Sequence, residues 1–164
     1  MGKIELVIET DKISIFSPKY DGEKMTEFEK FMANFGTLKQ PQLKKDFDAI
    51  IAIIAKMSRD CGARENLFRP EERKIKAIPL CVEQRRNKKV GTVRLYCIRI
   101  SGKILIIGNG GVKRVAKFED DQVLSEIVKQ LRNIEHSIYI ATRKAKVDYE
   151  NYDKVKKIIE NLII

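Results

Sequence analysis

Hydrophobic residues alternate with polar ones at the start of the chain and again in its middle. Over residues 3–9, Ile4, Leu6 and Ile8 alternate with largely polar neighbours, which is the period of a half-buried strand. The segment KISIFS behind it predicts a second short strand or a hairpin partner. The segments TVRLYCIRI and KILIIG are the strongest strand signals, and the turn Ser101–Gly102 joins them. We therefore expect a β-hairpin in the middle of the chain.

Apolar residues at spacings of three and four predict two helices after the first strands, and together these make a helical hairpin. The first begins near residues 22–26, where TEFE resembles a capping box, and ends at Gly36. The second begins near Pro41, which is tolerated in a first turn, and runs towards Gly62. Its apolar stripe consists of Leu43, Phe47, Ile50, Ile51, Ile54 and Met57.

Two further helices are expected after the central strands. Asn109–Gly110 is a strong turn signal, so the segment GVKRVAKF either folds back as a short strand or leaves as a loop. Asp120 or Asp121 caps the third helix. Its buried side is expected to hold Val123, Leu124, Ile127, Val128, Leu131, Ile134 and Ile138. A last helix begins at about Asp148 and packs either on the body or on a second subunit.

The order of these elements is β(β)-α-α-β-β-β-α with a terminal helix, which predicts the α+β class. We expect an N-terminal strand or hairpin, a helical hairpin, an antiparallel β-meander and C-terminal helices. Pro70 and Pro79 argue against one long central strand before the meander. Residues 1–145 are expected to form a single domain and residues 146–164 a helical extension.

The positive charge of the chain is concentrated in one block. The formal net charge is +10, yet the segment from Arg73 to Lys117 holds thirteen Lys or Arg and a single acid, Glu83. Such a block is typical of a surface that binds a polyanion, with nucleic acid as the first candidate. An acidic protein partner or a solvated basic face are the other interpretations.

Side-chain alternation assigns some of these charges to faces of strands. Arg94 and Tyr96 share one face of VRLYCIRI, and Lys74 and Lys76 share one face of RKIKAIPL. If the two strands pair, one sheet face presents lysines, an arginine and a tyrosine, which would attract phosphate and stack an unpaired base. The alternative is that Tyr96 packs against a helix and Arg94 lies along the surface.

The glycine-rich segment GNGGVKR invites comparison with a phosphate-binding loop. The nucleotide P-loop requires Ser or Thr after its lysine, and neither follows Lys113. A tight turn or bulge at a strand end, which presents Lys113 and Arg114 at the rim, is the better interpretation.

Several functional classes are not indicated. Cys61, Cys81 and Cys97 form no CxxC pair and the chain has a single histidine, His136, so we expect no metal, no cofactor and no disulfide framework. The longest apolar run, residues 49–55, is too short to cross a bilayer. The first residues lack the pattern of a secretion signal, so we expect a cytoplasmic protein without a membrane partner.

The central motifs resemble those of the RelE/HigB superfamily of toxins from bacterial toxin–antitoxin pairs. The segments that carry the resemblance are GTVRLY (residues 91–96), GGVKR (residues 110–114) and KIKAIPL before them. The resemblance implies a RelE-like fold and metal-independent cleavage of messenger RNA, usually on the ribosome, held in check by an antitoxin protein. Cleavage would proceed by attack of the RNA 2′-hydroxyl on the adjacent phosphorus.

The resemblance also implies roles for individual residues. Arg94 would stabilise the transition state, Lys76 would hold phosphate or ease proton removal, and Arg114 or Lys113 would protonate the leaving group. The further RNA contacts are expected at Lys74, Tyr96, Arg73, Arg85, Arg86 and Lys117.

Two alternatives stand beside this hypothesis. Many members of the superfamily carry a tyrosine or histidine shortly after the basic cluster, whereas this chain has Lys117–Phe118 there. This difference favours a non-catalytic module of the same fold that binds RNA, DNA or an acidic protein segment, including the branch that inhibits DNA gyrase. The third interpretation is an interaction domain that forms a homodimer through its terminal helix.

Overall fold

The fold is α+β, as predicted, and it is built on a six-stranded mixed sheet with the strand order β1-β2-β6-β5-β4-β3. The computed structural model describes residues 1–80 and 89–164. The strands are β1 (Lys3–Glu9), β2 (Ser14–Lys19), β3 (Arg69–Glu72), β4 (Ile75–Ile78), β5 (Thr92–Ser101) and β6 (Ile104–Lys113). The helices are α1 (Glu27–Phe35), α2 (Pro41–Lys56), α3 (Gln122–Ala145) and α4 (Tyr152–Glu160).

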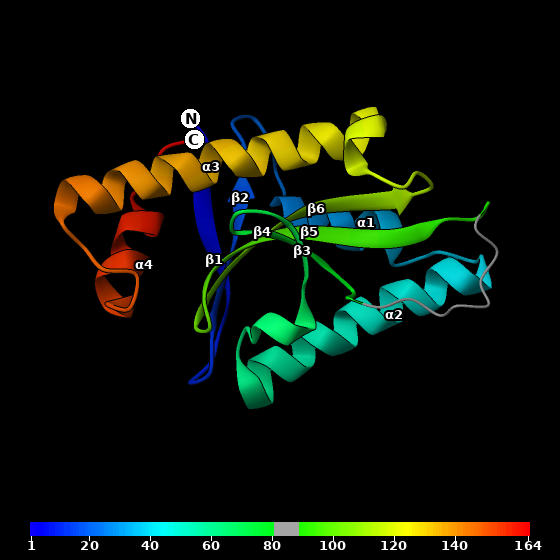
Figure 1. The fold of residues 1–164 in the computed structure, drawn as a ribbon, viewed down its shortest axis with the longest axis horizontal. Coiled ribbons are helices and arrows are strands. Elements are labelled where there is room, and N and C mark those ends of the chain that lie inside the picture. Colours follow the sequence, from blue (N-terminus) through cyan, green and yellow to red (C-terminus); the bar gives the residue numbers. More distant parts are fainter. Residues whose placement is uncertain (81–88) are drawn as a thin grey trace.

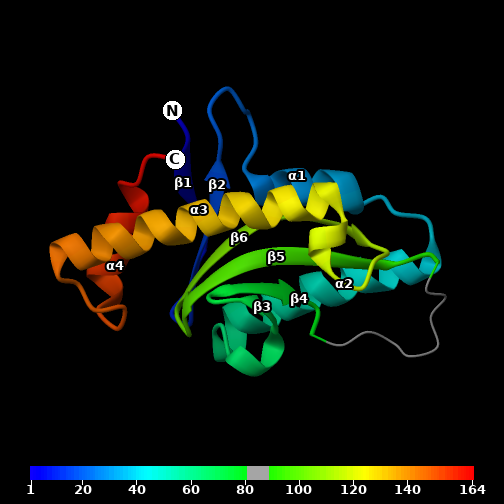
Figure 2. The same cartoon turned by 45° about the horizontal axis from the view of Figure 1, so that its top comes forward.

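Helices cover both faces of this sheet (Figures 1 and 2). The alternation along β5 decides which residues meet which layer, as predicted. Tyr96 and Ile98 belong to the core beneath α3 and α4, whereas Leu95 and Cys97 belong to the core beneath α1 and α2. The β1–β2 hairpin joins the antiparallel β3–β6 meander through a parallel pairing of β2 with β6.

The helix termini follow the predicted caps. Thr26 caps α1 in a capping box with Glu29, and Pro41 occupies the first turn of α2, which continues through a π-helical turn to Cys61. Of the two candidate aspartates, Asp121 caps α3, where its side chain accepts from the Leu124 N–H at 3.0 Å. The predicted buried side of α3 is wrong at Val123, which is 66% exposed because it points away from the sheet.

The terminal helix packs on the body of the protein. Val155 and Ile159 of α4 are fully buried in the core beneath α3. The two chain ends lie together (Figure 1), and Gly2 and Ile164 exchange both backbone hydrogen bonds at 3.1 and 3.0 Å. Of the two packing modes considered for this helix, the structure therefore shows the one within the chain.

The prediction of a turn at Asn109–Gly110 is wrong, because β6 continues to Lys113. The pairing with β5 shifts in register there, so Gly108 and Asn109 together oppose Tyr96 in a β-bulge. A Cβ atom at Gly110 would lie 2.0 Å from the carbonyl oxygen of Arg94, so only glycine fits at that position. The turn of the hairpin itself is Gly102–Lys103, one residue later than predicted.

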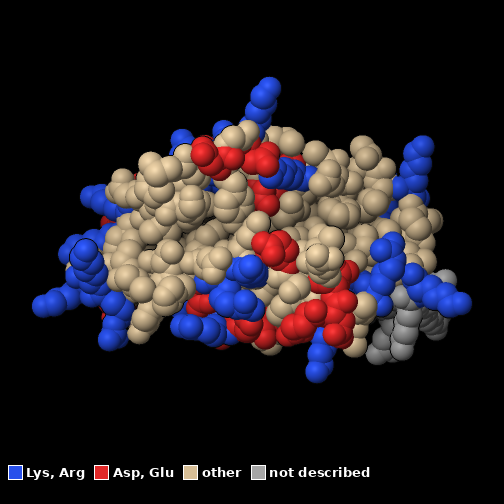
Figure 3. Space-filling view, turned by 90° about the horizontal axis from the view of Figure 1, so that it is seen from above, with Lys and Arg blue, Asp and Glu red and all other residues tan. Residues whose placement is uncertain are grey.

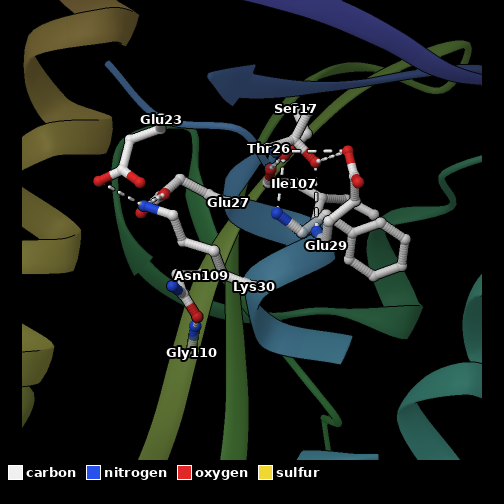
Figure 4. Close-up of polar contacts among 10 residues, drawn as sticks. Ser17, Glu23, Thr26, Glu27, Glu29, Lys30, Ile107, Asn109 and Gly110 are labelled. Carbon is white, nitrogen blue, oxygen red and sulfur yellow. Dashed lines mark hydrogen bonds and ion pairs between the residues drawn. The ribbon is translucent and has the colours of Figure 1, made fainter. Parts of the chain in front are cut away.

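Ser17 ties three elements together at the point where β2 and β6 separate. Its hydroxyl donates to the Ile107 carbonyl of β6 at 2.7 Å and accepts from the Phe28 N–H of α1 at 3.0 Å (Figure 4). The side chain is fully buried, so no water replaces these bonds if it is removed. Ser17 thereby places α1 beside the end of β6.

The change Ser17→Ala should lower the free energy of unfolding by about 1–3 kcal/mol, because it leaves one buried donor and one buried acceptor unpaired. Urea denaturation measures this. The control Ser137→Ala removes an exposed hydroxyl that bonds within α3, and it should change stability by less than about 0.5 kcal/mol. Equal effects of the two changes would contradict the role of Ser17.

Candidate anion-binding site

The register of β4 against β5 separates two of the residues expected to act together. Lys76 pairs with Cys97, while Ala77 pairs with Tyr96. Paired residues share a face, so Lys76 lies on the opposite face of the sheet from Arg94 and Tyr96. The prediction that Lys76 and Arg94 share one face is therefore wrong, although the two strands do pair.

Lys74 is diverted by the β3–β4 turn. Arg73 in that turn has a positive φ of 50°, and its side chain forms an ion pair with Glu135 of α3 at 3.5 Å. The Lys74 ammonium lies 4.7 Å from the centre of the Tyr149 ring, and burial lowers its pKa. Arg73 and Lys74 thus face the C-terminal helices, and Lys74 lies beside Arg99 and Ile100, several residues along β5 from Arg94.

Tyr96 is enclosed by the core. Its side chain is fully buried and its ring meets the Phe118 ring edge-on at 6.3 Å between centres. The hydroxyl has no hydrogen-bond partner among the described residues, and burial raises the pKa of Tyr96 far above its ordinary value. The prediction of Tyr96 as a platform for a base is wrong in this structure, and the alternative of packing beneath a helix is correct.

Arg94 is a buried cation with an unpaired donor. It is only 4% exposed, its Nη1 donates to the Pro79 carbonyl, and its Nε has no partner among the described residues. Burial lowers the pKa of Arg94, and the nearby Arg69 lowers it further. Among the described residues, this desolvated positive charge therefore has one unused donor.

Lys113 lies close enough to Arg94 for their charges to repel. It is 8% exposed and forms neither a hydrogen bond nor an ion pair with a described residue. Burial lowers the pKa of Lys113 first, and the positive charges of Arg69 and Arg94 lower it further. The partly exposed Arg69 and the buried Arg94 and Lys113 therefore gather three positive charges in one place, which we call the cation cluster.

Carboxylates partly offset this cluster: Glu71 raises the pKa values of both Arg94 and Lys113, Asp46 that of Arg94 and Glu119 that of Lys113. Glu71 on β3 is nearly buried, and its Oε1 lies 3.6 Å from the Arg69 Nε, beyond hydrogen-bonding distance. Sequence reasoning missed Arg69 and Glu71. Arg69 pairs with Ala77, and Ala77 with Tyr96, so only the pairing of three strands brings these charges beside Arg94. A buried arginine with an unpaired donor, beside a buried lysine with no direct partner among the described residues, favours binding of an anion.

The exposed positive charge next to this cluster lies just after the end of β6. Arg114 and Lys117 are exposed, and with Lys113 they form what we call the basic segment. The prediction that Lys113 and Arg114 both stand at the rim holds only for Arg114. The predicted contacts Arg85 and Arg86 lie outside the described residues.

The central block does not form one continuous basic face. Arg99 donates a hydrogen bond to the Ala63 carbonyl at 2.6 Å and forms an ion pair with Glu65 at 3.6 Å, so its charge has partners within the protein. On the α3 side, Lys and Arg lie at both ends, whereas in the middle Asp and Glu are interspersed with further Lys and Arg (Figure 3). The right-hand end in that view is where β5 begins and β6 ends (Figure 1).

Other kinds of site find no support in the described part of the chain. Cys61 and Cys97 are free thiols, and Cys81 lies outside the described residues. Across residues 1–80 and 89–164, His, Cys, Asp and Glu nowhere gather in a group of three that could hold a metal ion. None of the helices in these ranges has both the length and the apolar character needed to span a membrane.

Comparisons with protein-family models, curated proteins and solved structures find no match to this chain. The geometry of the site and the short motifs GTVRLY and GGVKR are therefore the observations that bear on the function of this protein. The relationship to the RelE/HigB toxins stays a prediction.

Replacing Lys113 by methionine should stabilise the fold by about 1 kcal/mol, because it removes a buried charge without a direct partner. Since the pKa of Lys113 is lower in the folded than in the unfolded chain, wild-type stability should rise with pH above the folded value, and Lys113→Met should reduce this rise, while Lys74, whose pKa is also lowered, keeps its own share. Urea unfolding at neutral and alkaline pH measures both effects. The exposed control Lys117→Met should retain the full rise, and an undiminished rise in Lys113→Met would contradict the assignment.

Proposed function

We propose that this protein binds single-stranded RNA through the basic segment, with the cation cluster behind it. The observation that carries this proposal is the continuity between the two. Lys113 belongs to both, and it joins the buried charge of Arg94 to the exposed charges of Arg114 and Lys117. A phosphate placed at Lys113 would relieve the repulsion among the three cations of the cluster.

In this mode of binding the protein contacts the phosphate backbone of the RNA and not its bases. Tyr96, Phe118 and Phe68, the chain neighbour of Arg69, are all buried, so they offer no ring to a base. Phosphate contacts made by Lys and Arg are independent of sequence and depend strongly on salt. Motifs shared with RNA-cleaving toxins favour RNA over DNA as the polyanion.

Endoribonuclease activity is the second candidate, and one observation favours it. A lysine with a lowered pKa transfers protons more readily at neutral pH, and Lys113 has such a pKa beside the guanidinium of Arg94. These two residues supply a proton donor or acceptor and a stabilising charge for metal-independent cleavage of messenger RNA. As the toxin resemblance implies, an antitoxin would then restrain the activity, and the ribosome would present the substrate.

The double change Arg114→Ala/Lys117→Ala should weaken binding to a twelve-nucleotide oligo(U) RNA. It should also reduce the slope of log affinity against log salt by about 1.4, because each lost phosphate contact contributes about 0.7 for a single strand. Fluorescence anisotropy at several salt concentrations measures this. Oligo(A) should bind with similar affinity.

The control Lys144→Ala/Lys154→Ala removes the same charge at exposed positions of the C-terminal helices. Equal losses in the two double variants would contradict a site at the basic segment. Denaturing gels of the same reactions, and of messenger RNA on translating ribosomes, separate the two candidates. Fragments that end in a 2′,3′-cyclic phosphate with the wild type in either reaction, but not with Lys113→Met, would establish cleavage, whereas RNA that stays intact in both would support binding without cleavage.

A further inference from the structure

A hollow of about 800 Å³ lies between α1, the end of β6 and α3, next to the basic segment. Residues 109–112 of β6 form its floor, Glu27 and Phe35 of α1 line one side, and Leu124 and Ile127 of α3 line the other. Figure 4 shows Glu27 of α1 near Asn109 and Gly110 of β6. The RNA-binding proposal does not use this space, apart from Arg114 at its border.

The floor of the hollow is an open strand edge. On that side of β6, β2 pairs only with residues 104–106, and the Ser17 hydroxyl donates a hydrogen bond to the Ile107 carbonyl. Within the described chain, residues 109–112 make no interstrand backbone hydrogen bonds except those to β5, and the Gly110 N–H donates to the Asn109 Oδ1 at 2.8 Å. The remaining unpaired backbone groups at such an edge are a template for a further strand, which would also have to displace the Asn109 side chain to reach the Gly110 N–H.

The walls of the hollow are acidic on a strongly basic protein. Glu27, Asp121 and Glu126 line it together with a single cation, Arg114, while the whole chain carries a formal net charge of +10. Glu27 is paired with Lys30 at 2.8 Å and Asp121 caps α3, whereas Glu126 is exposed and forms no ion pair with a described residue. This charge repels a nucleic acid and attracts a cationic ligand.

The dimensions fit a short extended peptide. The lining part of α3, from Gln122 to Gln130, is about 12 Å long at 1.5 Å per residue. An extended chain covers that distance with three or four residues at about 3.3 Å each. The exposed side chain of Val123 and the half-buried side chain of Ile127 would contact apolar residues of such a strand, while Glu126 would meet a cationic one.

We propose that this hollow binds an extended segment of a partner protein that carries lysine or arginine and adds a strand to the open edge of β6. Backbone hydrogen bonds to residues 109–112 would supply most of the affinity in this mode, and the acidic wall would select the charge. The ligand is thus opposite in charge to the one proposed for the basic segment.

The probe is a capped hexapeptide of alternating lysine and valine, titrated into the isotopically labelled full-length protein and followed by NMR. Backbone amide signals of residues 109–112 should shift in a saturable manner. The charge reversal Glu126→Lys should weaken binding at least fivefold. The control Glu150→Lys makes the same charge change at an exposed position far from the hollow, and it should change affinity by less than twofold.

A second probe tests strand addition itself. The same hexapeptide with N-methylated backbone at every second residue keeps its charge but loses donors along one edge, and it should bind at least tenfold more weakly. Equal binding of the two peptides, shifts that avoid residues 109–112, or equal effects of Glu126→Lys and Glu150→Lys would each overturn the proposal. The affinity of Glu126→Lys for RNA should be unchanged or higher. A loss of peptide binding in this variant would therefore not result from damage to the RNA site.

Discussion

The close approach of β5 to β6 at Gly110 is the constraint on which the candidate site depends. Because a Cβ atom there would lie 2.0 Å from the Arg94 carbonyl oxygen, no other residue keeps the two strands paired at this point. The bulge beside Gly110 resets the register so that Lys113 pairs with Thr92 and lies near Arg94. The missing side chains at Gly108 and Gly111 let Leu131 and Leu124 of α3 pack directly on the sheet.

The same arrangement separates two surfaces of opposite charge. Beyond its bulge, β6 ends in Lys113 and is followed by the exposed Arg114, while its other edge is left open between α1 and α3. The cation cluster costs folding free energy, because burial and mutual repulsion lower the pKa values of Arg94 and Lys113. Destabilising charge of this kind is typical of sites that bind a ligand.

Local patterns in the sequence predict the elements well and their pairing poorly. The alternation in VRLYCIRI and the capping box at Thr26 depend on neighbouring residues only, and both are confirmed. Whether Lys76 and Arg94 lie on the same face is decided by the register between β4 and β5. The position of Arg69 beside Arg94 is decided by the pairing of a third strand, β3, with β4. Asn109–Gly110 shows the limit of a turn signal, because pairing with β5 across the bulge overrides the local preference of this dipeptide.

The most direct test of the account is an NMR titration of the Lys113 ammonium in the free protein and in complex with oligo(U) RNA. We expect a pKa below the ordinary lysine value in the free protein, and a rise in that pKa when the RNA is bound, because a phosphate beside the ammonium favours its charged form. A Lys113 pKa that stays the same at saturating RNA would contradict the central claim that this cation cluster meets the phosphate.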